Sequence, residues 1–503
     1  MATTIAELVF IPAPGLGHIM STIEIAKLLV SRAHHLSITV LVIKPLPNPT
    51  FGSGSAITTY IDSLSKSTMD RISFIQLHQD ETPPVMDSKA PVASTQVFIN
   101  SHCKYVRDVV ADMINKPGSR RIAGFVVDMF CTAMIDVANE FNIPTYVFFT
   151  SNAGFLGFMF YIQTLCDDHK QDILELSCSS DAMISIPSFV KPVPTKVFPA
   201  TIQSREGLEI FLWSARKLRQ AKAIMVNTFM ELETHAIKSL MEDITIPPVY
   251  AVGPILNLEG AAGNMSENDV IRWLDSQPPS SVVFLCFGSM GSFEEVQVKE
   301  IAHALERSGY RFVWSLRRPP SDQTTRAPTD YEDPSTILPE GFLERTAGIG
   351  KVTGWVPQVA LLAHHAVRGF VSHCGWNSLL ESLWFGVPSA TWPIYAEQQI
   401  NAFEMVVELG LAVEIKLDYK KDMFNHEVDE VIVMAEEIER GMVDEVIVMA
   451  EEIERGIRRV MEDNDVRTKV KEMSEKSRAA VINGGSSYAS VDYLIQDFVR
   501  NIF

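Results

Sequence analysis

The sequence alternates between short apolar runs rich in Val, Ile and Phe and longer segments whose apolar residues recur at helical spacing. In the first half, ELVFIP precedes IMSTIEIAKLLVSR, and LSITVLVI follows. In the second half, SVVFLCFGS, EEVQVKEIAHALERSG and RFVWSLRR repeat the same order. This alternation is typical of parallel strands joined by crossover helices. The chain is therefore predicted to be an α/β protein with doubly wound, Rossmann-like parallel sheets.

The length of 503 residues indicates more than one such domain. A Gly- and Asn-rich segment, Val252–Asp269, separates the two halves and is the predicted linker. We expect an N-terminal domain at 1–251, a C-terminal domain at 270–484, and a last helix at 485–503 that packs back on the N-terminal domain. Two such domains would face each other across a cleft, with ligands bound beyond the C-terminal ends of the strands.

The composition limits the classes of partner. Hydrophobic residues make up 47% of the chain, which allows a large core, and the net charge of −19 makes nucleic acid a poor partner. No apolar run reaches the length of about 18–20 residues that a membrane span needs. The six cysteines are dispersed without a C-x-x-C pair, which favours reduced thiols and a cytoplasmic location. We expect a monomer.

The junction between GFVSH and NSLLESLWFG places polar residues between a buried strand and a helix. A helix start presents backbone N–H groups and a partial positive charge, which suit a phosphate. His373, Asn377 and Ser378 can add donors, and Glu381, one turn further on, suits two ribose hydroxyls. The fragment alone also allows a simple helix cap beside a buried histidine.

The flanking residues extend this pattern. Upstream, GWVPQ offers Trp355, whose indole can stack on a nucleobase, and Gln358. Downstream, WPIYAEQQ offers Glu397 and Gln398, which can bind sugar hydroxyls. The block W-x-P-Q, H-C-G-W-N-S-x-x-E and E-Q resembles the signature box of plant family-1 UDP-glucose-dependent glycosyltransferases. The resemblance covers nearly the whole chain, including WLDSQPPSSVVFLCFGS and FIPAPGLGH.

The resemblance implies the GT-B fold, with the acceptor mainly in the first domain and UDP-glucose, as sugar-donor substrate, mainly in the second. It implies that Trp355 and the Val356 backbone bind uracil and that Gln358 and Glu381 hold the ribose. The positions that would hold the diphosphate are Ser289, His373, Asn377 and Ser378. The positions that would face the sugar are Trp376, Glu397 and Gln398. A final Gln suggests glucose where His suggests galactose, and Trp376 in place of Arg argues against glucuronic acid.

For catalysis, the resemblance aligns His18 with the family's general base and Asp128 with its orienting carboxylate. A lone His at a helix start is more often structural, but its pKa suits proton transfer near neutral pH. Asp128 ends an apolar strand, where a buried carboxylate is costly without a partner, so pairing with His18 is expected. A local turn or cap role for Asp128 is the alternative.

The resulting hypothesis is an inverting O-glucosyltransferase without a metal cofactor, acting on a small apolar acceptor such as a flavonoid, another phenolic or a triterpenoid. Two other classes are weighed against it. A nicotinamide-dependent oxidoreductase would need G-x-G-x-x-G/A, whereas GLGHIMS has His and Ser in the wrong places. A non-catalytic nucleotide-sugar-binding protein would be favoured by the absence of His18 or Asp128. The D-x-D at Asp463–Asp465 is interpreted as solvated surface.

Two segments fall outside this pattern. Arg318–Gly341 is rich in Pro and polar residues and is predicted to be a mobile surface loop. VDEVIVMAEEIERG occurs twice, at Val428–Gly441 and Val443–Gly456, which indicates a local tandem duplication. The resemblance implies a single helix here. The second copy leads directly into IRRVMED, so we expect it to be the packed copy, with a break near Gly441 and Met442.

Overall fold

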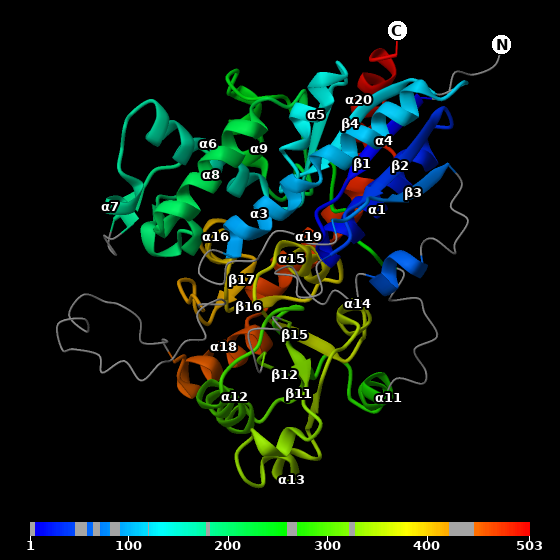
Figure 1. The fold of residues 1–503 in the computed structure, drawn as a ribbon. Helices are drawn as coiled ribbons and strands as arrows, with labels where there is room; N and C mark the ends of the chain where they lie inside the picture. The colour runs from blue at the N-terminus through cyan, green and yellow to red at the C-terminus, as the bar shows by residue number, and fades with distance from the viewer. Residues whose placement is uncertain are drawn as a thin grey trace. The chain divides into compact units, whose positions relative to one another are not determined.

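The chain forms two compact units (Figure 1). The computed structural model describes residues 6–45, 58–63, 71–80, 91–118, 120–177, 182–258, 269–320, 327–421 and 447–502. Unit 1 comprises Met1–Lys196, Thr201–Asn257 and Glu475–Phe503, and unit 2 comprises Val197–Ala200 and Leu258–Ser474. The division between the units thus falls at 257/258 and again at 474/475, inside a helix.

Unit 1 is built on a seven-stranded parallel sheet in the order β3-β2-β1-β4-β5-β8-β9. The strands are β1 (Ala6–Ile11), β2 (Leu36–Val42), β3 (Ile72–Gln76), β4 (Ile122–Asp128), β5 (Thr145–Phe149), β8 (Ala223–Val226) and β9 (Val249–Ala251). Central β1 is buried along its whole length, because helices cover both faces of the sheet. In its register, Val9 lies beside Thr39 of β2 and Phe125 of β4.

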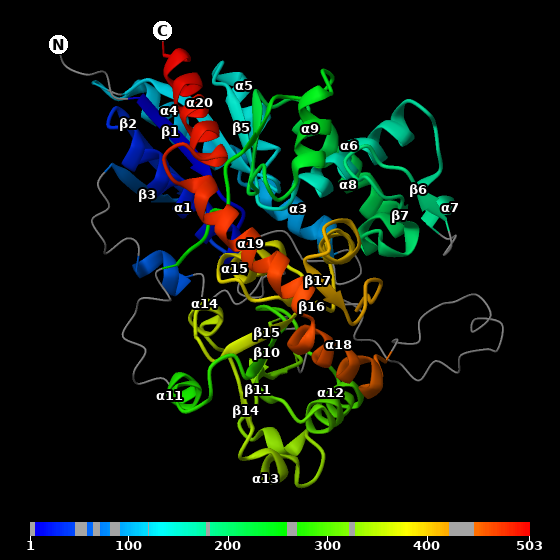
Figure 2. The same cartoon turned by 180° about the vertical axis from the view of Figure 1, so that it is seen from behind.

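Helices surround this sheet. They are α1 (Leu16–Arg32), α3 (Pro91–Ser101), α4 (Cys103–Asn115), α5 (Met134–Glu140), α6 (Ala153–Asp167), α7 (Ile173–Ser177), α8 (Arg205–Leu218), α9 (Thr234–Glu242) and α20 (Ser486–Arg500). A short antiparallel pair joins β6 (Met183–Ile184) to β7 (Val193–Pro194). The last helix, α20, lies in the N-terminal unit (Figure 2). It contacts β4 and β9 and buries Val491, Leu494 and Phe498 in the core of unit 1. Residues near the C-terminus therefore complete the N-terminal unit.

Unit 2 repeats the same architecture with a six-stranded parallel sheet in the order β14-β11-β10-β15-β16-β17. Its strands are β10 (Val282–Cys286), β11 (Arg311–Ser315), β14 (Gly350–Thr353), β15 (Val367–Ser372), β16 (Ser389–Thr391) and β17 (Ala412–Glu414). Its helices are α11 (Asp269–Asp275), α12 (Glu295–Ser308), α13 (Phe342–Thr346), α14 (Gln358–Leu362), α15 (Trp376–Trp384), α16 (Gln398–Phe403), α18 (Ala450–Glu462) and α19 (Asn464–Val481). The prediction of two doubly wound α/β domains is confirmed.

The segment Arg318–Gly341, predicted to be a mobile surface loop, contains short regular elements in its described part. β12 (Arg317–Arg318) pairs antiparallel with β13 (Thr329–Asp330), and a 3₁₀ turn follows at Pro334–Thr336. Most of the described residues of this segment are exposed or partly exposed, in agreement with a surface position, and its mobility stays a prediction. A strand of two residues is too short to show an alternating apolar and polar pattern in the sequence. Its stability depends on pairing with the partner strand.

The second copy of the duplicated segment is packed into unit 2, as predicted. From Ile447 onward it is described, and Val448, Ala450 and Ile453 lie in the main core cluster. Gly456 packs so closely that a Cβ there would lie 2.2 Å from Cγ1 of Ile415. The first copy and the predicted break lie outside the described residues.

Two further observations bear on the predictions. Among the described helices, none has both the length and the hydropathy needed to cross a lipid bilayer. The D-x-D segment has a local structural role, since Oδ1 of Asp463 accepts the N–H groups of Asp465 and Val466 at 3.1 and 3.0 Å. Asp463 thus caps the start of α19.

Candidate active site

His18 and Asp128 meet at the C-terminal edge of the unit 1 sheet. Asp128 is the last residue of β4, and His18 lies in the first turn of α1, which follows the neighbouring strand β1. Nδ1 of His18 and Oδ2 of Asp128 are 2.8 Å apart. The Asp128 side chain is fully buried, whereas that of His18 is 22% exposed. With Nδ1–H donated to the carboxylate, Nε2 is the basic nitrogen of the ring.

Two neighbours of this pair were not predicted from the sequence. Oγ1 of Thr150, just beyond β5, lies 3.0 Å from Nδ1 of His18. The ring of Phe130 lies edge-on to His18, with 5.2 Å between centroids, and its backbone N–H donates to Oδ1 of Asp128. The carbonyl oxygen of Phe130 accepts from Nε2 of Gln96 at 3.1 Å. The sequence could have indicated Thr150 as the polar residue that directly follows β5, the strand beside β4.

In unit 2, the predicted phosphate site lies between β15 and α15. Gly375 is the N-cap of α15 and has no side chain with which to cap the helix. Trp376, Asn377 and Ser378 therefore form the first turn itself, and neither Asn377 nor Ser378 occupies the N-cap position. Cys374 has a φ of 64°, which turns the chain sharply into the helix.

His373 is buried beside this junction. Its Nδ1 has no hydrogen-bond partner within the described residues. A Cβ at Gly288 or Gly375 would lie 2.6 or 2.5 Å from its Nε2, so glycines on both sides make room for the ring. Burial lowers the pKa of His373 to about 4, so the ring is neutral at neutral pH. Exposed Ser289 is adjacent to Gly288 in the turn after β10, the strand beside β15.

The predicted ribose-binding residues form one hydrogen-bonded group. Nε2 of Gln358, at the start of α14, donates to Oγ of Ser378 at 2.8 Å and to Oε2 of Glu381 at 2.7 Å. Burial raises the pKa of Glu381 to about 7. Just before α14, the Trp355 side chain is 63% exposed, while Val356 is buried. Gln358 and Glu381, which are predicted to bind the ribose, therefore lie beside Ser378, which is predicted to bind the diphosphate.

The predicted sugar-binding residues lie around α16 and the start of α15. Oε1 of Gln398 accepts the backbone N–H groups of Ile394 and Tyr395 at 2.9 and 3.1 Å. Gln398 and Trp376 are buried, and Glu397 is the partly exposed N-cap of α16. The amide of Gln398 is therefore held in one direction by the turn that precedes α16.

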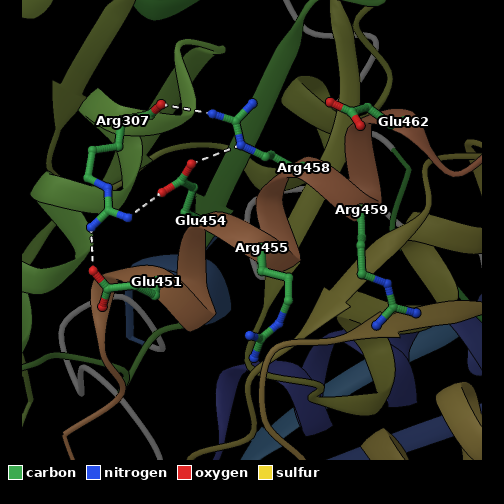
Figure 3. Close-up of a pocket in the computed structure, with 7 residues that line it drawn as sticks. All are labelled: Arg307, Glu451, Glu454, Arg455, Arg458, Arg459 and Glu462. Carbon is green, nitrogen blue, oxygen red and sulfur yellow. Dashed lines mark hydrogen bonds and ion pairs between the residues drawn. The ribbon is translucent and has the colours of Figure 1, made fainter.

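A separate hollow on α12 and α18 was not predicted (Figure 3). It is lined by Arg307, Glu451, Glu454, Arg455, Arg458, Arg459 and Glu462. Arg307 pairs with Glu451 and with Glu454, and Arg458 pairs with Glu454, at 2.5, 2.9 and 2.9 Å. The two pairs of Arg307 link α12 to α18, whereas the pair between Arg458 and Glu454 lies within α18. Their surface position makes each of modest energetic value.

Comparisons with known proteins identify the family of this chain. Residues 7–434 match the family described as UDP-glucoronosyl and UDP-glucosyl transferase. UDP-glycosyltransferase 71A15 of Malus domestica is 51% identical, over 97% of this chain and 98% of its own. Putative UDP-glucose flavonoid 3-O-glucosyltransferase 3 of Fragaria ananassa is 50% identical, over 97% and 98%.

Solved structures give the same result. A UGT transferase from Siraitia grosvenorii in complex with UDP has a TM-score of 0.84 and 45% identity, covering 98% of this chain and 100% of its own. Medicago truncatula UGT71G1 complexed with UDP-glucose has a TM-score of 0.81 and 40% identity, covering 99% of each chain. The chain therefore belongs to the UDP-glucoronosyl and UDP-glucosyl transferase family, and it is a glycosyltransferase with the GT-B fold.

Proposed function

We propose that this glycosyltransferase is an inverting O-glucosyltransferase, which moves glucose from UDP-glucose to a hydroxyl of a small apolar acceptor. The observation that carries the proposal is the 2.8 Å contact between Nδ1 of His18 and Oδ2 of Asp128. A histidine oriented by a buried carboxylate is the arrangement that general-base catalysis requires.

In the proposed reaction, Nε2 of His18 accepts the proton of the acceptor hydroxyl. The Asp128 carboxylate keeps Nδ1–H in place and stabilises the imidazolium that forms. The acceptor oxygen bonds to C1 of glucose as the bond from C1 to the diphosphate oxygen breaks. Attack from the face opposite UDP inverts the anomeric centre, so UDP-α-glucose yields a β-glucoside. The proton remains on His18 and UDP carries away the electron pair.

The departing diphosphate would be held at the start of α15. The first turn of a helix suits an anion, and Ser289, Asn377 and Ser378 add donors there. Support for a ligand beside His373 is the position of its Nε2, which lies next to the glycines of both turns at this junction, Gly288 and Gly375.

The nucleoside would be held by stacking and by the ribose group. Exposed Trp355 supports stacking on uracil, with the Val356 backbone at its edge. Glu381, which already accepts a hydrogen bond from Gln358, would accept hydrogen bonds from the ribose hydroxyls. For the sugar we propose glucose, bound by Trp376, Glu397 and Gln398; relatives named as glucosyltransferases and a neighbour solved with UDP-glucose support this choice.

The proposed acceptor is a flavonoid, another phenolic or a triterpenoid. The half-buried ring of Phe130 beside His18 supports a flat apolar molecule. Relatives named for flavonoid or anthocyanidin glucosylation, and a neighbour solved with pterostilbene, support the phenolic class. We also propose a cytoplasmic monomer, and the free thiols of the described cysteines are consistent with a reducing compartment.

A transfer assay tests this function. The protein is incubated with UDP-glucose and a panel of flavonoids, simple phenolics and triterpenoids, and the product linkage is determined by NMR. The expected product is a β-O-glucoside. An α-glucoside would contradict inversion, and the absence of transfer to every hydroxyl acceptor would contradict the proposal. EDTA should leave the rate unchanged; a loss that Mg²⁺ restores would contradict the metal-free reaction.

A further inference from the structure

We propose that Asp330 is a positioning residue for donor recognition. Together with Ser315, it fixes the peptide group between Gly354 and Trp355 and so directs the indole toward the uracil ring. The inference rests on the proposed function, which assigns Trp355 to uracil stacking.

The peptide group that precedes Trp355 is held on both of its polar atoms. Oδ1 of Asp330 accepts the N–H of Trp355 at 3.0 Å. Oγ of Ser315 donates to the carbonyl oxygen of Gly354 at 2.9 Å. The two backbone atoms belong to one planar unit, so two side chains from different strands set its orientation.

This control of the backbone matters because the indole itself is poorly held. The Trp355 side chain is 63% exposed, so packing against the protein does not determine its direction. The direction in which the side chain leaves the chain must come from the backbone. A stacking group that is already oriented loses less freedom when the base binds, which favours affinity.

Asp330 is in turn held by a mostly buried arginine. Nε of Arg317 lies 2.9 Å from Oδ1 of Asp330, and the Arg317 side chain is only 13% exposed. The same guanidinium donates to the carbonyl oxygens of Pro328 and Thr329, at 2.6 and 3.3 Å. Arg317 on β12 therefore holds both the backbone and the carboxylate of β13. This short strand pair is the support for Asp330.

Gly354 shows how closely Asp330 approaches this turn. A Cβ at Gly354 would lie 2.2 Å from Cγ of Asp330 and 2.5 Å from both carboxylate oxygens. A side chain at position 354 would displace the carboxylate from the Trp355 N–H. The glycine before Trp355 thus makes room for Asp330, and Gly354→Ala should have the same effect on UDP binding as loss of Asp330.

The test compares Asp330→Ala, Trp355→Ala and the double variant by calorimetric titration with UDP and by steady-state kinetics with UDP-glucose. Asp330→Ala should raise the Kd for UDP and the KM for UDP-glucose by about 3- to 10-fold, as expected for one lost hydrogen bond, with kcat within about twofold. In the Trp355→Ala background, Asp330→Ala should cause no further loss, because its effect acts through the indole.

Two variants serve as matched controls. Asp330→Asn retains an oxygen that can accept the Trp355 N–H, so it should restore most of the affinity. Asp333→Ala removes a nearby exposed carboxylate that accepts the backbone N–H of Ser335 in the following turn, and it should leave the Kd for UDP unchanged. If Asp330→Ala does not fold, Ser315→Ala releases the same peptide group from its other side and should raise the Kd instead.

The outcomes separate two kinds of failure. An unchanged Kd in Trp355→Ala would contradict the proposed uracil site itself. If Trp355→Ala binds UDP more weakly but Asp330→Ala has an unchanged Kd, the positioning role alone is overturned. Where Ser315→Ala replaces Asp330→Ala, an unchanged Kd in Ser315→Ala has the same meaning. Effects that multiply in the double variant would also overturn it, since Asp330 would then act independently of the indole.

Discussion

The two candidate regions, one in each unit, differ in how far their polar groups are already satisfied. In unit 1, Nδ1 of His18 lies within hydrogen-bond distance of both Asp128 and Thr150, so the ring is fixed before any ligand arrives. In unit 2, Nδ1 of His373 has no partner within the described residues, and the Trp355 indole is largely exposed. Burial there also raises the pKa of Glu381 to about 7.

This difference fits the work proposed for each region. Proton transfer needs an oriented base, and a ring fixed in advance requires no reorganisation during the reaction. A nucleotide site instead gains affinity when the ligand satisfies groups that the folded protein leaves unsatisfied, and those groups reduce the stability of the free protein. Variants in unit 1 should therefore affect kcat, whereas variants in unit 2 should affect donor binding and stability.

The largest effect is expected for His18→Ala. Without the base, kcat should fall by about 10²- to 10⁴-fold. The Kd for UDP should stay the same, because the proposed donor-binding residues are unchanged. Turnover is measured by chromatography of the glucoside and the Kd by calorimetric titration.

Asp128→Ala is the companion variant for this prediction. Its loss of kcat should be smaller than that of His18→Ala, because the base is retained but poorly oriented. Near-normal turnover in His18→Ala would show that another group removes the proton. A large loss of UDP affinity would show that the two regions are not separable.

Glu381→Gln should raise the Kd for UDP by about 10-fold at pH 8, because the ribose hydroxyls lose a charged acceptor. In the parent protein, UDP should bind more weakly as the pH falls through 7 and the carboxylate takes up a proton. In the variant this pH dependence should disappear. Calorimetric titrations between pH 6 and 8 check both statements, and an equal pH dependence in the two proteins would remove Glu381 from the ribose site.

Glu381→Gln also has an expected effect on stability. Between its ordinary pKa of 4.5 and the raised value of about 7, the folded protein binds more protons at Glu381 than the unfolded chain does. The free energy of unfolding therefore decreases as the pH rises through this range. The variant lacks this penalty, so it should be more stable by up to about 3 kcal/mol at pH 8 and gain nothing at pH 4. Urea denaturation at the two pH values measures this difference.

Gln398→His should reduce the use of UDP-glucose by several fold more than it reduces UDP binding. The amide that accepts the N–H groups of Ile394 and Tyr395 is lost, so the turn at the proposed sugar site changes. Competition between UDP-glucose and UDP-galactose gives the sugar preference. An unchanged preference would remove Gln398 from the sugar site, and an equal loss of UDP affinity would indicate general damage to the turn.

Thr150→Val should lower kcat by about 3- to 10-fold, the size expected for one lost hydrogen bond. Valine keeps the shape of the side chain but removes the hydroxyl 3.0 Å from Nδ1 of His18. Thr150→Ser retains the hydroxyl and should keep most of the rate. If valine and serine have equal effects, the methyl group rather than the hydroxyl matters.

The smallest effect is expected for deletion of Val428–Met442, which leaves one copy of the duplicated segment. None of the residues assigned to either part of the site lies in it, so kcat and the Kd for UDP should stay within about twofold. The melting temperature should be equal to or above that of the parent, because the copy packed into unit 2 is retained. An insoluble or inactive deletion variant would show that the first copy is needed for the fold.

The sequence by itself predicted the fold class and most candidate site residues. Its alternation of strand and helix patterns predicted two doubly wound domains, because apolar periodicity directly reflects which faces are buried. The resemblance carried by W-x-P-Q and H-C-G-W-N-S-x-x-E drew attention to residues that lie together, including Gln358, Ser378 and Glu381.

Only the tertiary structure showed which further residues meet the predicted ones. Thr150 reaches His18 because β5 lies beside β4, and Phe130 is held there partly by Gln96 of α3. Asp330 was missed because its two-residue strand depends on pairing with β12 and leaves no local pattern. Periodicity and motifs report the local surroundings of each residue, whereas these contacts depend on strand order and on side chains that meet only after the sheets have formed.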